Sequence, residues 1–436
     1  MSTDALLGLV ESNRRGERAG IYSICSADRF VLEVGMTQAL RDETVVCIES
    51  TCNQVNQFGG YSGMTPAAFR AFVDSVATDM RFPLARVVLG GDHLGPHVWR
   101  GEAAEEAMAK ACELVRACVT AGYTKIHLDA SMRCADDPGD RHSRLDERTA
   151  TDRTVELCRA AEEARGELPA GAPAPVYVIG TEVPIPGGEL ADRSEVSVTR
   201  VEDVERTLTL AREAFERGGL HAAWERVIAV VTQPGVEFGD AVVFDYDRDG
   251  ARELSAYLTR NWPLVYEAHS TDYQTAAALW QMVEDHFAIL KVGPWLTFAM
   301  REALFALDSI ERELFAAEDH PARSRLREVL EATMVEHPDH WKGYYHGDER
   351  ELRLARSFSF SDRARYYWSR PELREAAGRL LGNLRQRPIP LTLLSQFLPR
   401  QYEAVRAGEL GDRPEDLIRH RILEIVDLYA SACGMR

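Results

Sequence analysis

Eight short runs of apolar, largely β-branched residues recur along the first three quarters of the chain, each followed by a longer amphipathic stretch. The runs span residues 20–27, 45–51, 86–93, 125–131, 176–183, 226–233, 264–270 and 287–294. They are apolar along most of their length, which is typical of parallel strands buried on both faces. Eight strand–helix units of this length predict a closed (β/α)8 barrel, the TIM barrel architecture.

The stretches between the runs carry helix start signals. Thr65 is a candidate N-cap with Pro66 at the first helical position, and residues 270–287 open with a Ser-Thr-Asp cap before apolar residues at helical spacing. The alternative architecture is an open, doubly wound α/β sheet. Its glycine-rich GxGxxG turn is missing after the first run, where the sequence reads ICSADRF, so the barrel is favoured.

The character of the sequence changes after residue 317, where the alternation of strand-like runs and amphipathic stretches ends. Helical and turn-like segments rich in arginine and aromatic residues follow. We therefore expect two parts: a barrel over residues 1–317 and a helical C-terminal extension over residues 318–436. The sequence leaves open whether residues 337–368 fold over the barrel mouth as a lid. For the three histidines of HPDHWKGYYH, an exposed helix or such a lid is favoured over a metal site, because Pro338 breaks their spacing.

Net charge limits the partners of this chain. The 436 residues carry a formal net charge of −18, which repels phosphate backbones and anionic lipid. No segment approaches the roughly 20 consecutive apolar residues that span a bilayer, and the N-terminus has no basic start followed by an apolar core. We predict a cytoplasmic protein that binds neither nucleic acid nor membrane.

Polar residues gather at the carboxyl ends of the predicted strands, where barrels of this type place their active sites. The candidates, in strand order, are Glu49; Asp92 and His93; Asp129 and Ser131; Glu182; Gln233 and Glu237; and Glu267, His269 and Asp272. Barrel closure brings these strand ends into one ring. Burying that number of carboxylates together is costly in free energy unless a cation compensates their charge. The sequence therefore predicts a bound divalent metal ion.

The metal ligands favoured by the sequence are His93, Glu182 and His269, with Glu267, Gln233 or Glu237 completing the set. Mn, Ni, Co, Zn and Mg are all open as the ion. The oxygen-rich donors suit Mn, Mg, Co or Ni somewhat better than a thiolate-type zinc site.

Some of these residues have a purely structural interpretation. Asp129, before Ser131, is about as suited to capping a helix or supporting a metal ligand as to being a ligand itself. His127 lies in mid-strand and is interpreted as a core histidine, and Lys125 at the opposite strand end is interpreted as an ordinary residue. Asp92 and His93 follow two glycines in GGDHLG, and nothing about folding requires that pair, so a functional role is favoured for them.

The loop after the second strand, ESTCNQVNQFGGYSGM, contains four side-chain amides. Paired amide donors and acceptors suit the recognition of sugar hydroxyls, which makes Asn53 and Gln57 candidate substrate contacts. The further candidates for substrate contact, at the strand ends, are Glu49, Asp129, Ser131, Glu237 and Asp272. An ordinary asparagine-rich turn is the alternative.

The motifs GGDHLGPHVW, HLDAS, IGTEVPIPGGE, QPGVEFG, EAHSTDYQT and LKVGPWLTFA, followed by SFSFSDRARYYW and PIPLTL, occur in order along the chain. In these motifs the chain resembles the Z-type subunit family of tagatose-bisphosphate aldolase, the GatZ/KbaZ family. The resemblance implies a barrel of the class II, metal-dependent aldolase type. Members are described as non-catalytic partners of a class II aldolase catalytic subunit, and some relatives as metal-dependent ketohexose 4-epimerases.

By the same resemblance, Asp92 corresponds to the proton-transfer acid of class II aldolases and His93 to a metal ligand. Asp129 and Glu182 correspond to carboxylates of neighbouring metal-site segments. The chain departs from the aldolases after strands six and seven, where it offers Gln233 or Glu237, and Glu267 with His269, in place of histidine ligands. The glycine-rich phosphate turn is also missing, and Trp295 is bulky, so a substrate phosphate is expected to fit poorly.

These features together favour a metal-dependent epimerase that interconverts fructose and tagatose at C4 by cleaving and re-forming the C3–C4 bond, with Asp92 and Glu182 as proton carriers. The alternative is a non-catalytic subunit that stabilises a separate tagatose-1,6-bisphosphate aldolase chain, and a true bisphosphate aldolase comes third. The expected ligand is a ketose. The sequence leaves the oligomeric state open, including a homo-oligomer.

Overall fold

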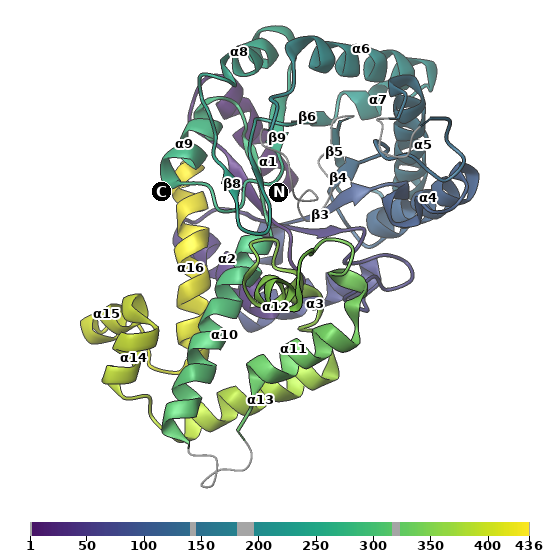
Figure 1. Cartoon of the computed structure of the whole chain (residues 1–436). Coiled ribbons are helices and arrows are strands. Elements are labelled where there is room, and N and C mark those ends of the chain that lie inside the picture. Colours follow the sequence, from purple (N-terminus) through teal and green to yellow (C-terminus); the bar gives the residue numbers. More distant parts are fainter. Residues whose placement is uncertain (1, 140–144, 181–195, 316–322, 436) are drawn as a thin grey trace.

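The computed structural model describes residues 2–139, 145–180, 196–315 and 323–435. Eight parallel strands form a closed barrel in the order β1-β10-β9-β6-β5-β4-β3-β2, and pairing of β1 with β2 completes the ring (Figure 1). The strands are β1 (Ile21–Ile24), β2 (Val46–Thr51), β3 (Val87–Leu94), β4 (Lys125–Leu128), β5 (Val176–Ile179), β6 (Val227–Thr232), β9 (Val265–Ala268) and β10 (Ile289–Val292). The predicted (β/α)8 barrel is confirmed, and each strand lies within one residue of its predicted run.

Helices follow each barrel strand and form the outer layer (Figure 1). They are α2 (Arg29–Arg41), α3 (Pro66–Asp79), α4 (Ala104–Thr120), α5 (Glu147–Gly166), α6 (Val201–Arg217) with α7 (His221–Trp224), α8 (Arg252–Asn261), α9 (Ala276–Glu284) and α10 (Pro294–Leu314). Short 3-10 turns η1 (Leu84–Arg86) and η2 (Pro96–Trp99) flank β3, and β7 (Glu237–Phe238) pairs with β8 (Val243–Phe244) outside the barrel.

Alternation along the strands divides the barrel interior into layers. Successive side chains of a strand point to opposite faces, so every second residue points inward. The lower interior is apolar, with Val88, Val176, Val265 and Ile289, and Leu6 and Val10 of helix α1 (Ser2–Arg14) pack into the same cluster. Two residues after Val265 and Ile289, the inward positions carry Glu267 and Lys291, and these charged groups begin the functional site.

The C-terminal region is helical, as expected. It contains α11 (Leu326–Glu336), η3 (Pro338–His340), α12 (Glu349–Phe358), η4 (Arg363–Tyr366), α13 (Pro371–Gln386), α14 (Leu391–Phe397), α15 (Pro399–Ala407) and α16 (Pro414–Ala432). Helix α16 returns to the barrel and packs against α2, α9 and α10 (Figure 1). The predicted boundary between residues 317 and 318 falls outside the described residues. No helix within the described ranges is both long and apolar enough to cross a membrane.

One of the two predicted helix caps is correct and one is wrong. Thr65 accepts a hydrogen bond from the backbone N–H of Ala68 and begins α3, as predicted. The N-cap of helix α9 is Thr275, five residues after the start of the predicted Ser-Thr-Asp cap. The carboxylate of Asp272 instead bonds to the start of α10. Ser, Thr and Asp favour loops and caps alike, so the pattern did not distinguish the two uses.

Asp28, the N-cap of α2, gives a test of electrostatics at the edge of the barrel. Burial raises the pKa of this carboxyl to about 6, although the N–H of Phe30 donates to it. The folded state therefore binds the proton more tightly than the unfolded state, and stability falls as pH rises from about 4 to about 6. A pKa difference of two units corresponds to about 3 kcal/mol of unfolding free energy. Because Asp28 is partly exposed, we expect the loss of stability over this pH range to be about 1–2 kcal/mol.

The Asp28→Asn variant keeps an oxygen for the cap and removes the charge. We expect it to match the parent in urea unfolding at pH 4 and to exceed the parent's stability at pH 7.5. A variant whose advantage is the same at both pH values would contradict this assignment.

Candidate functional site

Asp92 and His93 both turn into the barrel because β3 is irregular at its end. In a regular strand two successive side chains would point to opposite faces. The register of β3 against β4 shifts between Gly91 and Leu94, and His93 adopts a left-handed backbone with φ of 51°. This bulge brings the carboxylate and the imidazole to the same side, which is a known use of bulges near functional sites.

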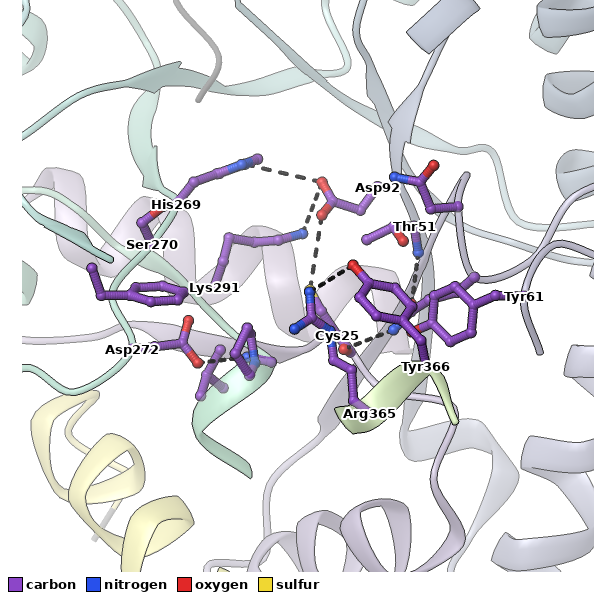
Figure 2. A pocket seen from close by; sticks show the side chains of 16 residues that line it. Cys25, Thr51, Tyr61, Asp92, His269, Ser270, Asp272, Lys291, Arg365 and Tyr366 are labelled. Carbon is purple, nitrogen blue, oxygen red and sulfur yellow. Dashed lines mark hydrogen bonds and ion pairs between the residues drawn. The ribbon is translucent and has the colours of Figure 1, made fainter. Parts of the chain in front are cut away.

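Asp92 lies at the centre of the resulting cluster (Figure 2). Its Oδ1 lies 2.9 Å from Nδ1 of His127, 3.1 Å from Nζ of Lys291 and 4.0 Å from Nε2 of His269. Burial alone would raise the pKa of Asp92, but His93, Lys291 and the other histidines hold it well below its usual value. Asp92 is therefore an ionised carboxylate that can accept a proton.

His93 is positioned by Asp129. Nδ1 of His93 lies 2.8 Å from Oδ2 of Asp129, and its Nε2 faces Oδ2 of Asp92 at 3.7 Å. Burial would lower the pKa of His93, but the two carboxylates raise it above its usual value. Asp129 also accepts hydrogen bonds from the backbone and hydroxyl of Ser131. Asp129 and Ser131 thus orient an imidazole instead of lining the cavity.

Three imidazoles meet around Asp92. The ring centroids of His93, His127 and His269 lie 4.9–5.2 Å apart in every pairing. Burial lowers the pKa of His269 to about 4, so its ring is neutral, and its Nε2 lies 3.0 Å from Oε1 of Glu267. His127 is fully buried, as expected of a core histidine, and it also belongs to this cluster.

Below the histidines, two lysines neutralise the buried carboxylates. Nζ of Lys125 lies 2.7 Å from Oε1 of Glu49 and 2.6 Å from Oε2 of Glu267, and all three side chains are fully buried. Lys291 also contacts Glu49 and lies 3.9 Å from Oε1 of Glu267. Burial alone would raise the pKa values of both glutamates, but the lysines keep them below their usual range. Glu49 therefore supports Lys291 from beneath and does not line the cavity, and Lys125 is not the ordinary residue that the sequence suggested.

A glycine makes room for this charged layer. A Cβ atom at Gly90 would lie 2.7 Å from Cγ of Glu49, so a side chain there would displace the glutamate. Gly90 pairs with Glu49 across strands β2 and β3, and any larger residue would disturb both lysine contacts. The glycine pair in front of Asp92 is thus explained in part by packing below the site.

The donor atoms of the cluster suit a divalent cation. Asp92, His127, Glu267 and His269 each offer one ligand atom, and these four atoms lie within 4.8 Å of one another. Nε2 of His127 is buried without a hydrogen-bond partner in the described part of the chain. Metal-binding histidines commonly bond to a carboxylate through one ring nitrogen and to the metal through the other. His127 bonds to Asp92 through Nδ1, and His93 bonds to Asp129 in the same way. The residues present therefore fit the predicted metal.

A cavity lies above this cluster, and the C-terminal extension helps to close it (Figure 2). Arg365 and Tyr366 of η4 line the cavity together with Tyr61, and the rings of Tyr61 and Tyr366 meet edge to face at 4.6 Å. His340 stacks on Tyr366 at 4.8 Å, so HPDHWKGYYH supports this cover. The lining is Cys25, Thr51, Asn53, Gln54, Tyr61, Asp92, Phe238, His269, Ser270, Asp272, Lys291, Val292, Gly293, Pro294, Arg365 and Tyr366. Two substrate-contact candidates, Asn53 and Asp272, are among them.

Three other candidates lie away from the cavity and the metal cluster. Gln57 donates from Nε2 to the carbonyl oxygen of Lys110, which turns its amide away. Oε1 of Gln233 accepts from two backbone N–H groups of its own turn, and Oε1 of Glu237 accepts from the N–H of Phe238. These residues stabilise loops and strand ends, so the structure does not bring them to the positions that the sequence predicted. Glu182 lies outside the described residues.

The sequence held a signal for two residues that it did not assign. Lys125, His127 and Asp129 are spaced by two, so all three point to the same face of one strand. Once Asp129 is placed in the barrel mouth, His127 and Lys125 must lie below it in the interior. By the same alternation, Lys291 of β10 points to the same face as Ile289 of the apolar interior.

Comparison with known proteins agrees with this geometry. The family model for the D-tagatose-1,6-bisphosphate aldolase subunit GatZ/KbaZ-like matches residues 6–434. A crystal structure from Sinorhizobium meliloti 1021, described as a probable tagatose 6 phosphate kinase, is 46% identical with a TM-score of 0.86, and the match covers 95% of this chain and 100% of that one.

Two aldolase structures are more distant. Fructose-bisphosphate aldolase from Campylobacter jejuni is 12% identical with a TM-score of 0.46, over 88% of this chain and 93% of its own. The YdjI aldolase from Escherichia coli K12 is 12% identical with a TM-score of 0.40, over 81% and 92%. Scores this low carry no argument about the present chain.

The family assignment therefore rests on the match along nearly the whole chain and on the neighbour at 46% identity. The family model agrees with the resemblance seen in the sequence motifs and connects the chain to aldolase-related carbohydrate metabolism. The chain belongs to the GatZ/KbaZ-like family of D-tagatose-1,6-bisphosphate aldolase subunits.

Proposed function

We propose that the protein is a metal-dependent ketohexose 4-epimerase that interconverts fructose and tagatose. The observation that carries this proposal is the meeting of an ionised carboxylate, Asp92, with three imidazoles and Lys291 at the floor of a lined cavity. Such a concentration of titratable groups in a concave site is typical of catalysis.

The chemistry of the substrate limits the route. In a 2-ketose the hydrogen on C4 is not adjacent to the carbonyl, so direct proton abstraction at that carbon is disfavoured. Transient oxidation needs a nicotinamide, whose glycine-rich fingerprint is missing from the first strand–helix turn. Cleavage of the C3–C4 bond and re-addition of the fragments needs only proton transfer and charge stabilisation.

In the proposed step, Asp92 accepts the proton of the C4 hydroxyl as the C3–C4 bond breaks, and the bonding electrons remain on the three-carbon enediolate. The aldehyde fragment turns over, C3 attacks its opposite face, and Asp92 returns the proton to the new C4 oxygen. Lys291, 3.1 Å from Asp92, keeps that carboxylate ionised and places a positive charge beside the reacting oxygens. Asn53 contributes an amide to the same cavity for holding the aldehyde.

A divalent ion would be held by His127, His269 and Glu267, and by His93 in the sequence prediction, next to the carboxylate of Asp92. It would supply Lewis-acid stabilisation of the enediolate charge. Glu182 remains a sequence prediction, as a second proton carrier or a ligand.

An isotope experiment tests the route. Fructose incubated with the purified protein and Mn or Ni in heavy water is expected to yield tagatose that retains hydrogen at C4, because the C4–H bond never breaks. Deuterium at C4, seen by NMR, would contradict cleavage and re-addition. Absence of tagatose with every divalent ion tested would contradict the epimerase itself.

The second candidate function is a stabilising subunit of a separate class II aldolase chain. The family description names a subunit, and Lys125 and Lys291 already neutralise the buried carboxylates, so the barrel can fold without a metal ion. A metal-free protein that is inactive alone but binds an aldolase chain tightly would support this function.

Metal dependence gives a separate prediction. We expect EDTA to abolish interconversion and added Mn or Ni to restore it. His269→Ala is expected to weaken metal binding by more than about 100-fold, since the loss of groups that only support a ligand already costs about 10–100-fold. Metal content of dialysed protein and titration with Mn check this, with His286→Ala as the control. His286 is a partly buried histidine that bonds to Asn13 and does not line the cavity.

A further inference from the structure

The start of helix α10 opens into the cavity. Gly293 and Pro294 line it, and the helix runs for 21 residues after β10. The first N–H groups of a helix have no partner within the helix and attract anions. In (β/α)8 barrels, the loops after the last two strands and a nearby helix N-terminus frequently hold a substrate phosphate. The position is therefore an anion site in principle.

A carboxylate of the chain itself occupies this position. Oδ1 of Asp272 accepts the N–H of Gly293 at 3.0 Å and the N–H of Trp295 at 2.8 Å (Figure 2). Asp272 lines the cavity and is 3% exposed. Two amides that could bind a phosphate oxygen are thus already bonded to a charged oxygen atom of the protein.

The loop that carries Asp272 is held on both sides. Ser270 and Tyr273 adopt left-handed backbones, with φ of 54° and 66°, which is costly for residues other than glycine. The hydroxyl of Tyr273 donates to the carbonyl oxygen of Phe360 at 2.6 Å, and the hydroxyl of Tyr429 in α16 donates to that of Thr271 at 2.7 Å. These contacts maintain the strained loop and fix the carboxylate against α10.

The cationic side chains that line the cavity are also engaged. Lys291 contacts Asp92 and Glu49. Arg365 donates to the carbonyl oxygens of Ser361 and Asp362 and, from Nη2, to the hydroxyl of Tyr366 at 2.8 Å. Both cations therefore already have oxygen partners among the described residues, and a phosphate would have to compete with those contacts.

We propose that Asp272 is a specificity-determining residue that makes the cavity select an unphosphorylated ketose. Its carboxylate fills the anion position of α10, repels a phosphate group, and accepts a hydroxyl of the free sugar instead. The inference rests on the proposed function, because it names the substrate class of the same site.

The test is direct binding of inorganic phosphate by isothermal titration calorimetry, with Asp272→Ser, Asp272→Asn and the parent. Removing the carboxylate in Asp272→Ser frees two amides, so we expect phosphate to bind at least about 10-fold more tightly than to the parent. Asp272→Asn keeps an oxygen for both amides and so preserves the loop. It removes only the charge repulsion, and we expect a smaller gain of about threefold.

The control is Asp28→Ser, which removes a carboxylate that caps a different helix start, outside the cavity. It is expected to bind phosphate as the parent does. Equal phosphate affinity in the parent and both Asp272 variants would overturn the proposal, and so would saturable binding of fructose 6-phosphate to the parent. Phosphate binding is measured without turnover, so it decides this inference even if the protein interconverts no ketoses.

Discussion

Asp92→Asn is expected to lower kcat for fructose–tagatose interconversion by about 10³-fold, within the range for loss of a general base. The amide has the shape of the carboxylate and can still accept from Lys291, but it takes up no proton at neutral pH. Because Asp92 acts on the C4 hydroxyl in the bond-breaking step, kcat is expected to fall more than KM rises. Steady-state assays with each sugar check this.

The control for Asp92 is another acid-to-amide change. Asp137 bonds to Arg153 at 2.6 and 2.8 Å and does not line the cavity, so Asp137→Asn is expected to leave kcat within about twofold of the parent if Asp92 alone carries the proton. Circular dichroism and metal content show whether Asp92→Asn still folds and binds metal. An Asp92→Asn protein that folds normally and retains more than a tenth of the parent's kcat would remove Asp92 from the mechanism.

Lys125→Met is expected to destabilise the fold by about 3–5 kcal/mol, because removing one partner of a buried ion pair leaves uncompensated charge behind. Methionine fills nearly the same volume, but Glu49 and Glu267 then lose the ammonium group that lies 2.6–2.7 Å from them. The free energy of unfolding in urea is the measurement. Adding Glu267→Met to Lys125→Met removes one of the two carboxylates left without an ammonium and is expected to recover part of the loss.

A surface lysine provides the comparison. Lys110 pairs with Glu102, and both side chains remain about one third exposed. Lys110→Met is therefore expected to cost less than about 1 kcal/mol. If Lys125→Met costs no more than Lys110→Met, the charged layer beneath the histidines is not a stabilising element of the barrel.

The barrel architecture could be predicted because parallel strands buried on both faces have a distinctive sequence pattern, a short continuous apolar run. Runs such as residues 227–231 are apolar throughout, and eight runs of this kind at regular intervals allow few folds other than the barrel. Asp92 and His93 could also be singled out, because glycines precede a pair of residues that no strand needs for packing. The bulge that turns both side chains inward left no comparable signal in the sequence.

The pairing of the charged groups in the barrel interior could not be predicted in the same way. His127 and Lys125 sit in a strand whose other residues are apolar, and alternation alone does not distinguish a barrel interior from a hydrophobic core. Only closure of the ring brings Lys125 of β4 against Glu49 of β2 and Glu267 of β9. Long-range pairing of this kind has no local sequence pattern.

The loop after β9 was misinterpreted for a related reason. Ser270, Thr271 and Asp272 have the composition of a helix cap, and the sequence assigned them to the helix that follows. Their positions depend on α10 and on Tyr429, which lie well beyond the local window. The role of Asp272 as a candidate substrate contact could be predicted from its place at a strand end, but its bond to a different helix could not.

The brace between Tyr429 and Thr271 joins residues 158 positions apart. During synthesis on a ribosome, all eight barrel strands emerge before Tyr429 does, so they can pair while the loop beside α10 still lacks its anchor. The barrel strands and the loop that lines the cavity therefore reach their final structures at different times. Nascent chains arrested before residue 429 should already resist proteolysis in the barrel, yet lack the finished recognition loop.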